Sequence, residues 1–208
     1  MSRASVGDNA PTKRGAAGTA TYSAGELILM PGSVGHLYRL VSGLVRLHAV
    51  DGAGYGVTLR YVKPGGYFGG EARTARQRRY FAEAGTDSSA EPVEVERLTR
   101  QGLVELTAFL ASSLEQMSDS LLRLAGKPLR ARVAAELLEL VDSALAGRNA
   151  AGDSVIYLTH DDLAAAVGSV RETVTKVIGD MARSGALRAG YGKIMVLDQG
   201  LLAEMANA

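Results

Sequence analysis

Three long polar side chains, those of Arg171, Glu172 and Lys176, lie within six residues of one another near the C-terminal end of the chain. An arginine carries a planar fork of N–H donors that matches the two adjacent acceptors on the edge of a guanine. A glutamate can accept from a cytosine amino group, and a lysine can donate to a base or a phosphate. The set therefore has the chemistry of a surface that reads base edges in DNA.

The segment Val170–Ser184 is expected to form the helix that presents these side chains. Its apolar residues recur at helical spacing and form one stripe of Val174, Val177, Ile178 and Met181. The opposite face holds Arg171, Glu172, Thr175 and Lys176 in the first two turns. Glu172 also has a simpler interpretation, because an acid in the first turn of a helix interacts favourably with the helix dipole.

A shorter helix is expected directly before this one. Thr159 is a suitable N-cap, and Asp161 and Asp162 place acids in the first turn. Gly168 is suited to the left-handed conformation that ends a helix. The two helices and the short turn between them predict a helix-turn-helix, although an ordinary amphipathic pair with a solvated charged face has the same spacing.

A basic hairpin follows the second helix at once. Residues 187–188 and 194–197 are strand-like and flank a glycine turn, and Lys193 lies near the tip of that turn. A hairpin in this place is typical of the winged form of the motif. In that form the second helix enters the major groove and the wing meets phosphates.

The run GSVRETVTKVIGDMARSGAL over 168–187 resembles the recognition helix of the CRP/FNR family of bacterial transcription regulators. Arg-Glu-Thr-Val over 171–174, followed by Lys176, is the pattern of members close to the catabolite activator. The resemblance, which extends from about residue 21 to 203, implies that Arg171, Glu172 and Lys176 read a TGTGA-like half-site. It also implies contacts to the DNA backbone from Thr159, Ser169, Thr173, Arg188 and Lys193.

The chain has 208 residues, a formal net charge of +1 and no cysteine. Its length suits one large or two small domains, and its charge means that any nucleic-acid surface is local. The lack of cysteine excludes disulfides, thiolate zinc sites and iron–sulfur clusters. The three histidines lack metal-ligand spacing and no catalytic constellation stands out, so neither a metal site nor an enzyme, a cupin-like one included, is expected. No apolar run could cross a bilayer and no signal peptide is visible, which predicts a cytoplasmic protein without a membrane partner.

The N-terminal half is predicted to be a disordered tail followed by an antiparallel β-roll. Residues 1–20 are small, polar and aperiodic. Residues 21–106 alternate short apolar segments with glycine turns, which favours many short antiparallel strands. The phrases over 24–26, 40–46 and 64–69 resemble the family's cyclic-nucleotide-binding roll.

The resemblance places an effector pocket in this roll, and its residues are degenerate. In nucleotide-binding members a glutamate holds the ribose and an Arg-Ser pair holds the cyclic phosphate, as suits a hydroxyl and an anion. Here Gly70 stands at the glutamate position, and no serine follows Arg78 and Arg79; a shift of one residue would make Glu71 the ribose ligand. We expect a regulator that needs no cyclic nucleotide; the alternative is a cyclic-AMP-responsive allosteric activator. The nearby arginines also fit a solvated loop, a partner surface or a site for a different anion; this cluster consists of Arg73, Arg76, Arg78 and Arg79.

Residues 107–126 are predicted to form a dimerisation helix. Leucine or methionine recurs at spacings of 4, 3, 4 and 3, as in the seam between two helices that pack lengthwise; the seam consists of Leu110, Leu114, Met117, Leu121 and Leu124. A helix that packs on its own roll would also show a stripe. Lys127–Pro128 should break the helix, and residues 127–208, with a loop over 146–154, should form the winged domain. The predicted fold is thus α+β: a β-roll, a long helix and a winged helix-turn-helix. Its partners are double-stranded DNA, a second copy of the chain and, as the resemblance implies, RNA polymerase.

Overall fold

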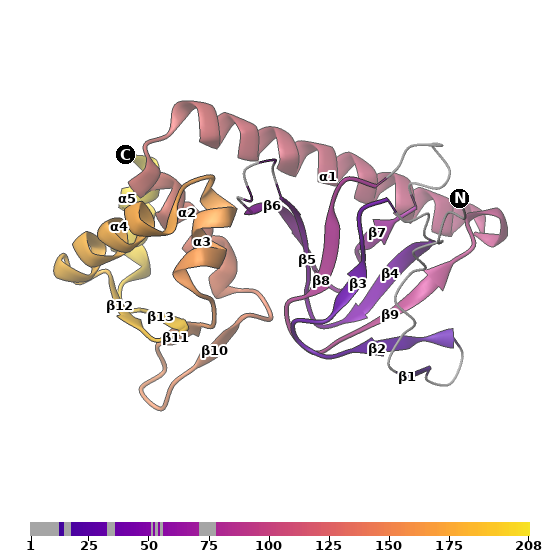
Figure 1. Cartoon of the computed structure of the whole chain (residues 1–208), viewed down its shortest axis with the longest axis horizontal. Helices are drawn as coiled ribbons and strands as arrows, with labels where there is room; N and C mark the ends of the chain where they lie inside the picture. The colour runs from indigo at the N-terminus through magenta and orange to yellow at the C-terminus, as the bar shows by residue number, and fades with distance from the viewer. Residues whose placement is uncertain are drawn as a thin grey trace, which may run out of the picture. The chain divides into compact units, whose positions relative to one another are not determined.

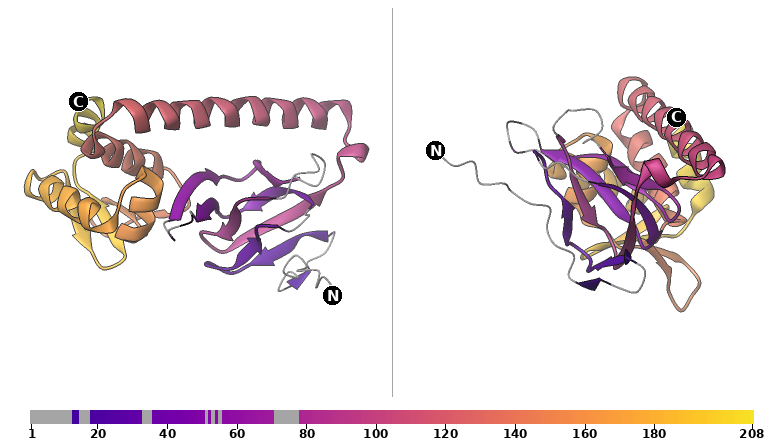
Figure 2. Two further views of the ribbon diagram at one scale, coloured as in Figure 1. Left: turned by 45° about the horizontal axis from the view of Figure 1, so that its top comes forward. Right: turned by 90° about the vertical axis from the view of Figure 1, so that its right-hand side faces the viewer.

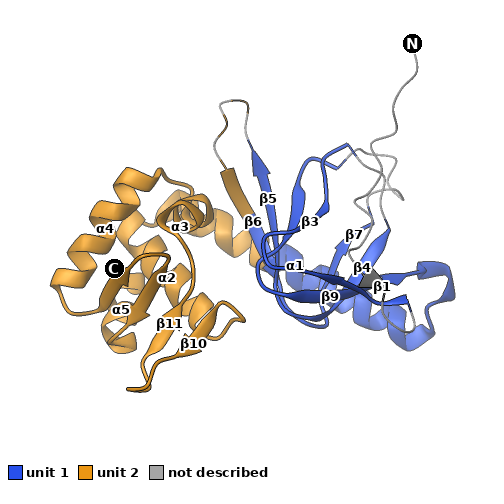
Figure 3. Ribbon diagram, turned by 60° about the horizontal axis from the view of Figure 1, so that its bottom comes forward, with its two compact units in different colours: residues 1–51, 59–115 blue, residues 52–58, 116–208 orange. Residues whose placement is uncertain are grey.

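The computed structural model describes residues 13–14, 18–32, 36–50, 52, 54, 56–70 and 78–208 (Figure 1). The chain divides into two compact units, coloured separately in Figure 3: residues 1–51 with 59–115, and residues 52–58 with 116–208. The unit boundary at 115 falls inside a long helix. The predicted α+β class, with antiparallel sheets before the long helix and a helix-turn-helix after it, is confirmed.

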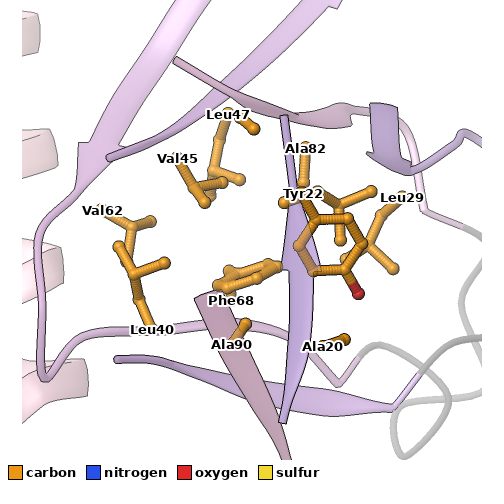
Figure 4. Close-up of a cluster of buried hydrophobic side chains, with 12 residues drawn as sticks. Ala20, Tyr22, Leu29, Leu40, Val45, Leu47, Val62, Phe68, Ala82 and Ala90 are labelled. Carbon is orange, nitrogen blue, oxygen red and sulfur yellow. The ribbon is translucent and has the colours of Figure 1, made fainter. Parts of the chain in front are cut away.

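The first unit is built on two antiparallel sheets. One sheet has the order β1-β2-β9-β4-β7, with β1 Lys13–Arg14, β2 Ala20–Tyr22, β9 Ser88–Val93, β4 Leu37–Ser42 and β7 Tyr67–Gly69. The other has the order β3-β8-β5-β6, with β3 Leu27–Leu29, β8 Phe81–Ala84, β5 Val45–Val50 and β6 Gly56–Val62. Side chains from both sheets share one apolar core, in which Phe68 and Leu40 from the first sheet meet Leu29 and Val45 from the second (Figure 4). Removal of this surface from water stabilises the roll.

The predicted tail over 1–20 is wrong in two details. Lys13 pairs with Thr21 and Arg14 with Ala20, so these residues form an edge strand, and β2 begins at Ala20. Strand pairing uses backbone N–H and C=O groups, which polar segments supply as well as apolar ones. The rest of the predicted tail up to residue 17 lies outside the described residues.

The long helix α1 spans Arg100–Gly126 and is uninterrupted in both views of Figure 2. It follows the 3-10 turn Val95–Arg97 and begins seven residues before the predicted start at 107. The N-terminal extension has a local cause, because the Thr99 hydroxyl accepts a hydrogen bond of 3.1 Å from the N–H of Gly102. A glycine at 102 weakens the helical pattern in the sequence, which explains the missed turns.

The second unit packs helices against a small sheet. Its helices are α2 Leu129–Val141, α3 His160–Val167, α4 Arg171–Arg183 and α5 Gln199–Asn207. Its antiparallel strands, in the order β10-β11-β13-β12, are β10 Ala146–Arg148, β11 Ser154–Ile156, β13 Lys193–Val196 and β12 Leu187–Gly190. Helix α2 is central, since it contacts α3, α4, α5 and β11. Leu137, Leu163, Ile178 and Leu202 are fully buried in this core.

The predicted loop over 146–154 is instead a β-hairpin. The side-chain oxygen of Asn149 accepts from the N–H groups of Ala151 and Asp153, both at 2.9 Å, which closes the turn. Strand β11 then pairs with β13, so the wing belongs to a four-stranded sheet. Both strands of the hairpin have only three residues, too few for a visible alternation of apolar and polar side chains.

The predicted break between α1 and α2 is confirmed, because α1 ends at Gly126 and Pro128 is the N-cap of α2. Arg123 and Glu139 join the two helices through an ion pair of 3.0 Å between Nη1 and Oε1. Glu136 lies near both. Burial is the main cause that raises the pKa of Glu136 to about 7; Glu139 adds to the rise and Arg123 opposes it.

We expect the free energy of unfolding to fall as the pH rises from 4.5 to about 7, because folded Glu136 keeps a proton that the unfolded chain has released. Glu136→Gln removes this titration. The variant should therefore exceed the wild type in stability above pH 7, by at most about 3.5 kcal/mol at about 1.4 kcal/mol per pKa unit. Partial solvent contact of the residue lowers that limit.

Urea titrations across this pH range measure the effect. Glu204→Gln, at an exposed glutamate of α5, is the control and should keep the wild-type dependence. An unchanged pH dependence in Glu136→Gln would show that another group is responsible.

Candidate nucleic-acid interface

Helices α3 and α4 form the predicted helix-turn-helix. The hydroxyl of Thr159 accepts from the N–H of Asp162 at 3.1 Å, and the Asp162 carboxylate accepts from the N–H of Thr159 at 3.1 Å. This reciprocal capping box confirms Thr159 as the N-cap. Gly168 ends α3 with φ of 61°, the predicted left-handed conformation, and α4 starts at Arg171 after a turn of two residues.

The predicted apolar stripe fixes the orientation of α4 within the second unit. Val174, Ile178 and Met181 are buried, while Val177 is half-buried at the edge of the stripe. The side chains on the opposite face are exposed: Arg171, Glu172, Thr173, Thr175 and Lys176. The three predicted base-reading residues therefore share one accessible face in the first two turns of α4.

Two contacts that sequence reasoning missed join the first turn of α3 to α4. An oxygen of Asp161 lies 3.2 Å from Nη1 of Arg171, and Nδ1 of His160 lies 2.9 Å from the hydroxyl of Thr175. These pairs connect different helices, so the spacing within either helix gives no signal for them. They place an acid and an imidazole beside the predicted reading surface.

The wing is the turn between β12 and β13. Lys193 is exposed and pairs through its backbone with Gly190, and Arg188 is exposed on β12. Tyr191 at the tip is fully exposed, and the sequence had suggested no role for it. Of the other predicted backbone contacts, Thr159 is exposed and Ser169 is half-buried.

The predicted effector residues have unequal surroundings in the first unit. Gly70 follows β7 with φ of 88°, and a Cβ at this position would lie 3.2 Å from Cδ1 of Leu37, so a glutamate here would be strained. Arg78 is buried and donates from Nη1 to the carbonyl of Met30 at 3.4 Å, whereas Arg79 is exposed. Glu71 lies outside the described residues, as do Arg73 and Arg76.

Another arginine, Arg60 on β6, joins the roll to the first half of α1. It donates to the hydroxyl of Ser113 at 2.9 Å and to the carbonyl of Tyr67 at 3.1 Å. Its guanidinium also lies 5.1 Å from the ring centre of Phe109, within the range of a cation–π contact. Burial lowers the pKa of Arg60 from its usual value, and Tyr80 offsets part of this. No sequence motif pointed to this cluster.

The five predicted seam residues of α1 are all exposed, with exposed fractions between 42% and 67%. The start of α1 at Arg100 extends the same spacing to Leu103, which is 44% exposed, by way of Thr107. Apart from Thr107, this edge of α1 presents exposed apolar side chains over its whole length. Among the residues that the structure describes, no group of His, Asp and Glu is placed to hold a metal ion, and no helix is long and apolar enough to cross a membrane.

Two family models match the chain: a cyclic nucleotide-binding domain over residues 19–108 and a Crp-like helix-turn-helix domain over residues 131–205. The transcriptional regulator SdrP of Thermus thermophilus is 49% identical over 193 residues, which cover 91% of this chain and 95% of the relative. The cyclic AMP receptor protein of the same species is 31% identical over 194 residues, covering 89% and 86%.

The solved structures agree with these relatives. A transcriptional regulator of the CRP/FNR family from Thermus thermophilus has a TM-score of 0.86 and 49% identity, and the match covers 91% of this chain and 98% of that one. A CRP-family regulator from the same organism has a TM-score of 0.84 and 33% identity, with coverage of 90% and 96%.

Proposed function

The chain belongs to the CRP/FNR family of transcription regulators, and from this premise we propose that it is a homodimer that binds a pseudo-palindromic DNA operator with TGTGA-like half-sites and needs no cyclic nucleotide. The main support is the exposed face of α4, which presents Arg171, Glu172 and Lys176 together. The DNA-bound dimer is expected to act in the cytoplasm through RNA polymerase, the partner that the family resemblance implies.

Each reading residue has a chemical role in this proposal. Arg171 donates its fork to O6 and N7 of a guanine, Glu172 accepts from a cytosine amino group, and Lys176 reaches a neighbouring base or phosphate one turn further along. An acid that faces a polyanion is costly unless it accepts such a hydrogen bond, which supports a reading role for Glu172. The backbone-contact set of Thr159, Ser169, Thr173, Arg188 and Lys193 sets the register without specifying sequence.

The proposed dimer follows from the apolar edge of α1. Two copies of this edge that pack lengthwise about a two-fold axis would remove the leucines from water. The same axis would present two recognition helices to half-sites about 34 Å apart, one turn of DNA. A palindromic operator is the DNA counterpart of that symmetry.

Two features of the first unit support the proposal that the regulator needs no cyclic nucleotide. The strained position of a glutamate at Gly70 disfavours a ribose ligand there. The Arg60 cluster supplies a link from the roll to α1 that consists of the protein's own side chains. The second candidate, a cyclic-AMP-responsive activator, is favoured by the identity of 31% to the cyclic AMP receptor protein.

Arg171→Ala should cost about 1–3 kcal/mol at one G·C pair and relax the preference there, because a bidentate contact is lost. Lys193→Ala should weaken binding to all sequences alike and lower the salt slope by about one, because it removes a phosphate contact. Selection from a random duplex pool, followed by titrations at several salt concentrations, measures both effects. The assignment fails when Lys193→Ala changes base preference and Arg171→Ala does not.

Leu114→Glu together with Leu121→Glu should dissociate the dimer and abolish tight operator binding, because two buried charges per helix would face each other across the axis. Light scattering at micromolar concentration gives the oligomeric state. Leu122→Glu is the matched control, since Leu122 is 70% exposed but lies beside the seam, and it should have a smaller effect. A monomeric wild type would contradict the proposal.

Cyclic AMP should raise operator affinity less than about tenfold, equivalent to about 1.4 kcal/mol of coupling, because a ligand shifts an equilibrium only through its different affinities for two states. Calorimetry with cyclic AMP and cyclic GMP, paired with operator titrations in their presence, tests this directly. A larger increase would favour the cyclic-AMP-responsive activator and a ribose ligand other than residue 70.

A further inference from the structure

Asp161 places a carboxylate against the guanidinium that is assigned to base reading. Its Oδ2 lies 3.2 Å from Nη1 of Arg171, and both side chains are nearly two-thirds exposed, at 64% and 63%. An ion pair with this exposure contributes little to the stability of a protein in water. The ion pair therefore adds little to the free energy of unfolding. It lies on the surface where DNA is proposed to bind.

We propose that Asp161 is a positioning residue that determines specificity: it holds the Arg171 fork in its reading orientation and disfavours binding to phosphates alone. The inference rests on the proposed function, in which Arg171 reads a guanine. Asp161 acts through Arg171 and through its own charge, and it contacts no base.

The orientation part of the inference follows from the chemistry of arginine. The guanidinium has five N–H donors in a rigid plane, so a carboxylate near Nη1 restricts the side chain and leaves other donors for a base. The neighbouring contact between His160 and Thr175, at 2.9 Å, helps to fix the first turn of α3 against α4. Asp161 is thus attached to a helix that is held in place beside the reading surface.

The charge part follows from the phosphates of DNA. A free arginine binds phosphate on any sequence, which adds non-specific affinity. A carboxylate beside it repels phosphates and competes for the guanidinium. On the correct operator, the guanine contact offsets this cost, and exclusion of water strengthens the remaining attraction between Asp161 and Arg171. Asp161 should therefore lower non-specific affinity more than specific affinity.

If Asp161 only interacted favourably with the dipole of α3, its replacement would have a different effect. Asp162 already closes the capping box at the same helix terminus. Loss of a favourable dipole interaction at Asp161 would lower the free energy of unfolding by about 0.3–1 kcal/mol. It would leave base preference unchanged, because folding stability has the same effect on binding to every sequence.

The test compares Asp161→Ala, Arg171→Ala and the double variant on the operator that the wild type selects from a random duplex pool. Binding is also measured to every single-base variant of that operator and to an unrelated duplex. Asp180→Ala is the matched control, since Asp180 pairs with exposed Arg183 on α4, about 13 Å along the helix from Arg171. Thermal unfolding of each variant separates stability from binding.

Asp161→Ala is expected to reduce discrimination at the guanine assigned to Arg171 about fivefold to tenfold and to raise affinity for the unrelated duplex about twofold to threefold. In the Arg171→Ala background, its effect on discrimination should vanish. Asp180→Ala should leave base preference unchanged.

Three results would overturn the inference. Asp161→Ala could weaken or strengthen all duplexes equally, which would reduce its role to a simple charge. It could also leave base preference unchanged while Arg171→Ala relaxes it, which would remove the positioning role and keep Arg171 as the reader. If Arg171→Ala itself leaves base preference unchanged, the reader assignment of the proposed function fails, and the role of Asp161 fails with it.

Discussion

Burial of Val174, Ile178 and Met181 sets the rotation of α4 about its own axis, and the proposed DNA-binding surface depends on that rotation. A helix has one apolar stripe, so the side chains opposite it must face outward. The capping box at Thr159 and the left-handed end at Gly168 then fix where α3 begins and ends. Because α2 contacts both helices, the pair is held as one body within its unit.

The apolar stripe of α4 is buried, whereas much of the apolar surface of the long helix α1 is exposed. Leu114 and Leu121 keep about two-thirds of their surface in contact with water. Leu106, in contrast, is buried, and Phe109 packs against Arg60 and Tyr67. One edge of α1 thus packs on residues of the roll, whereas the other edge is exposed. A single helix can combine both roles because neighbouring positions along it point in different directions.

Local signals in the sequence were enough to predict the helix-turn-helix. Caps, apolar periodicity and a proline break are read within a few residues, and Thr159, Gly168 and Pro128 each have the predicted role. The missed features depend on pairing and packing that the periodicity of one segment does not reveal. The hairpin over 146–156 joins two strands of three residues each, and its strand β11 also pairs with the distant β13. The contacts of Arg60 with α1 span about fifty residues. The ion pair of Asp161 with Arg171 likewise requires the crossing of two helices.

Gly168 ends α3, and it also lies beside Leu124, the last residue of the apolar edge of α1. A methyl group at this position would lie 2.8 Å from Cδ2 of Leu124, and Arg132 donates to the adjacent carbonyl of Val167 at 2.6 Å. Position 168 is therefore under two separate restrictions, one on backbone conformation and one on volume. Only the second can be relieved from outside, by a smaller residue at 124. Because the backbone conformation favours glycine at 168 in any case, this close approach leaves room for a leucine at 124 and brings the proposed dimerisation edge into contact with the proposed DNA-reading motif.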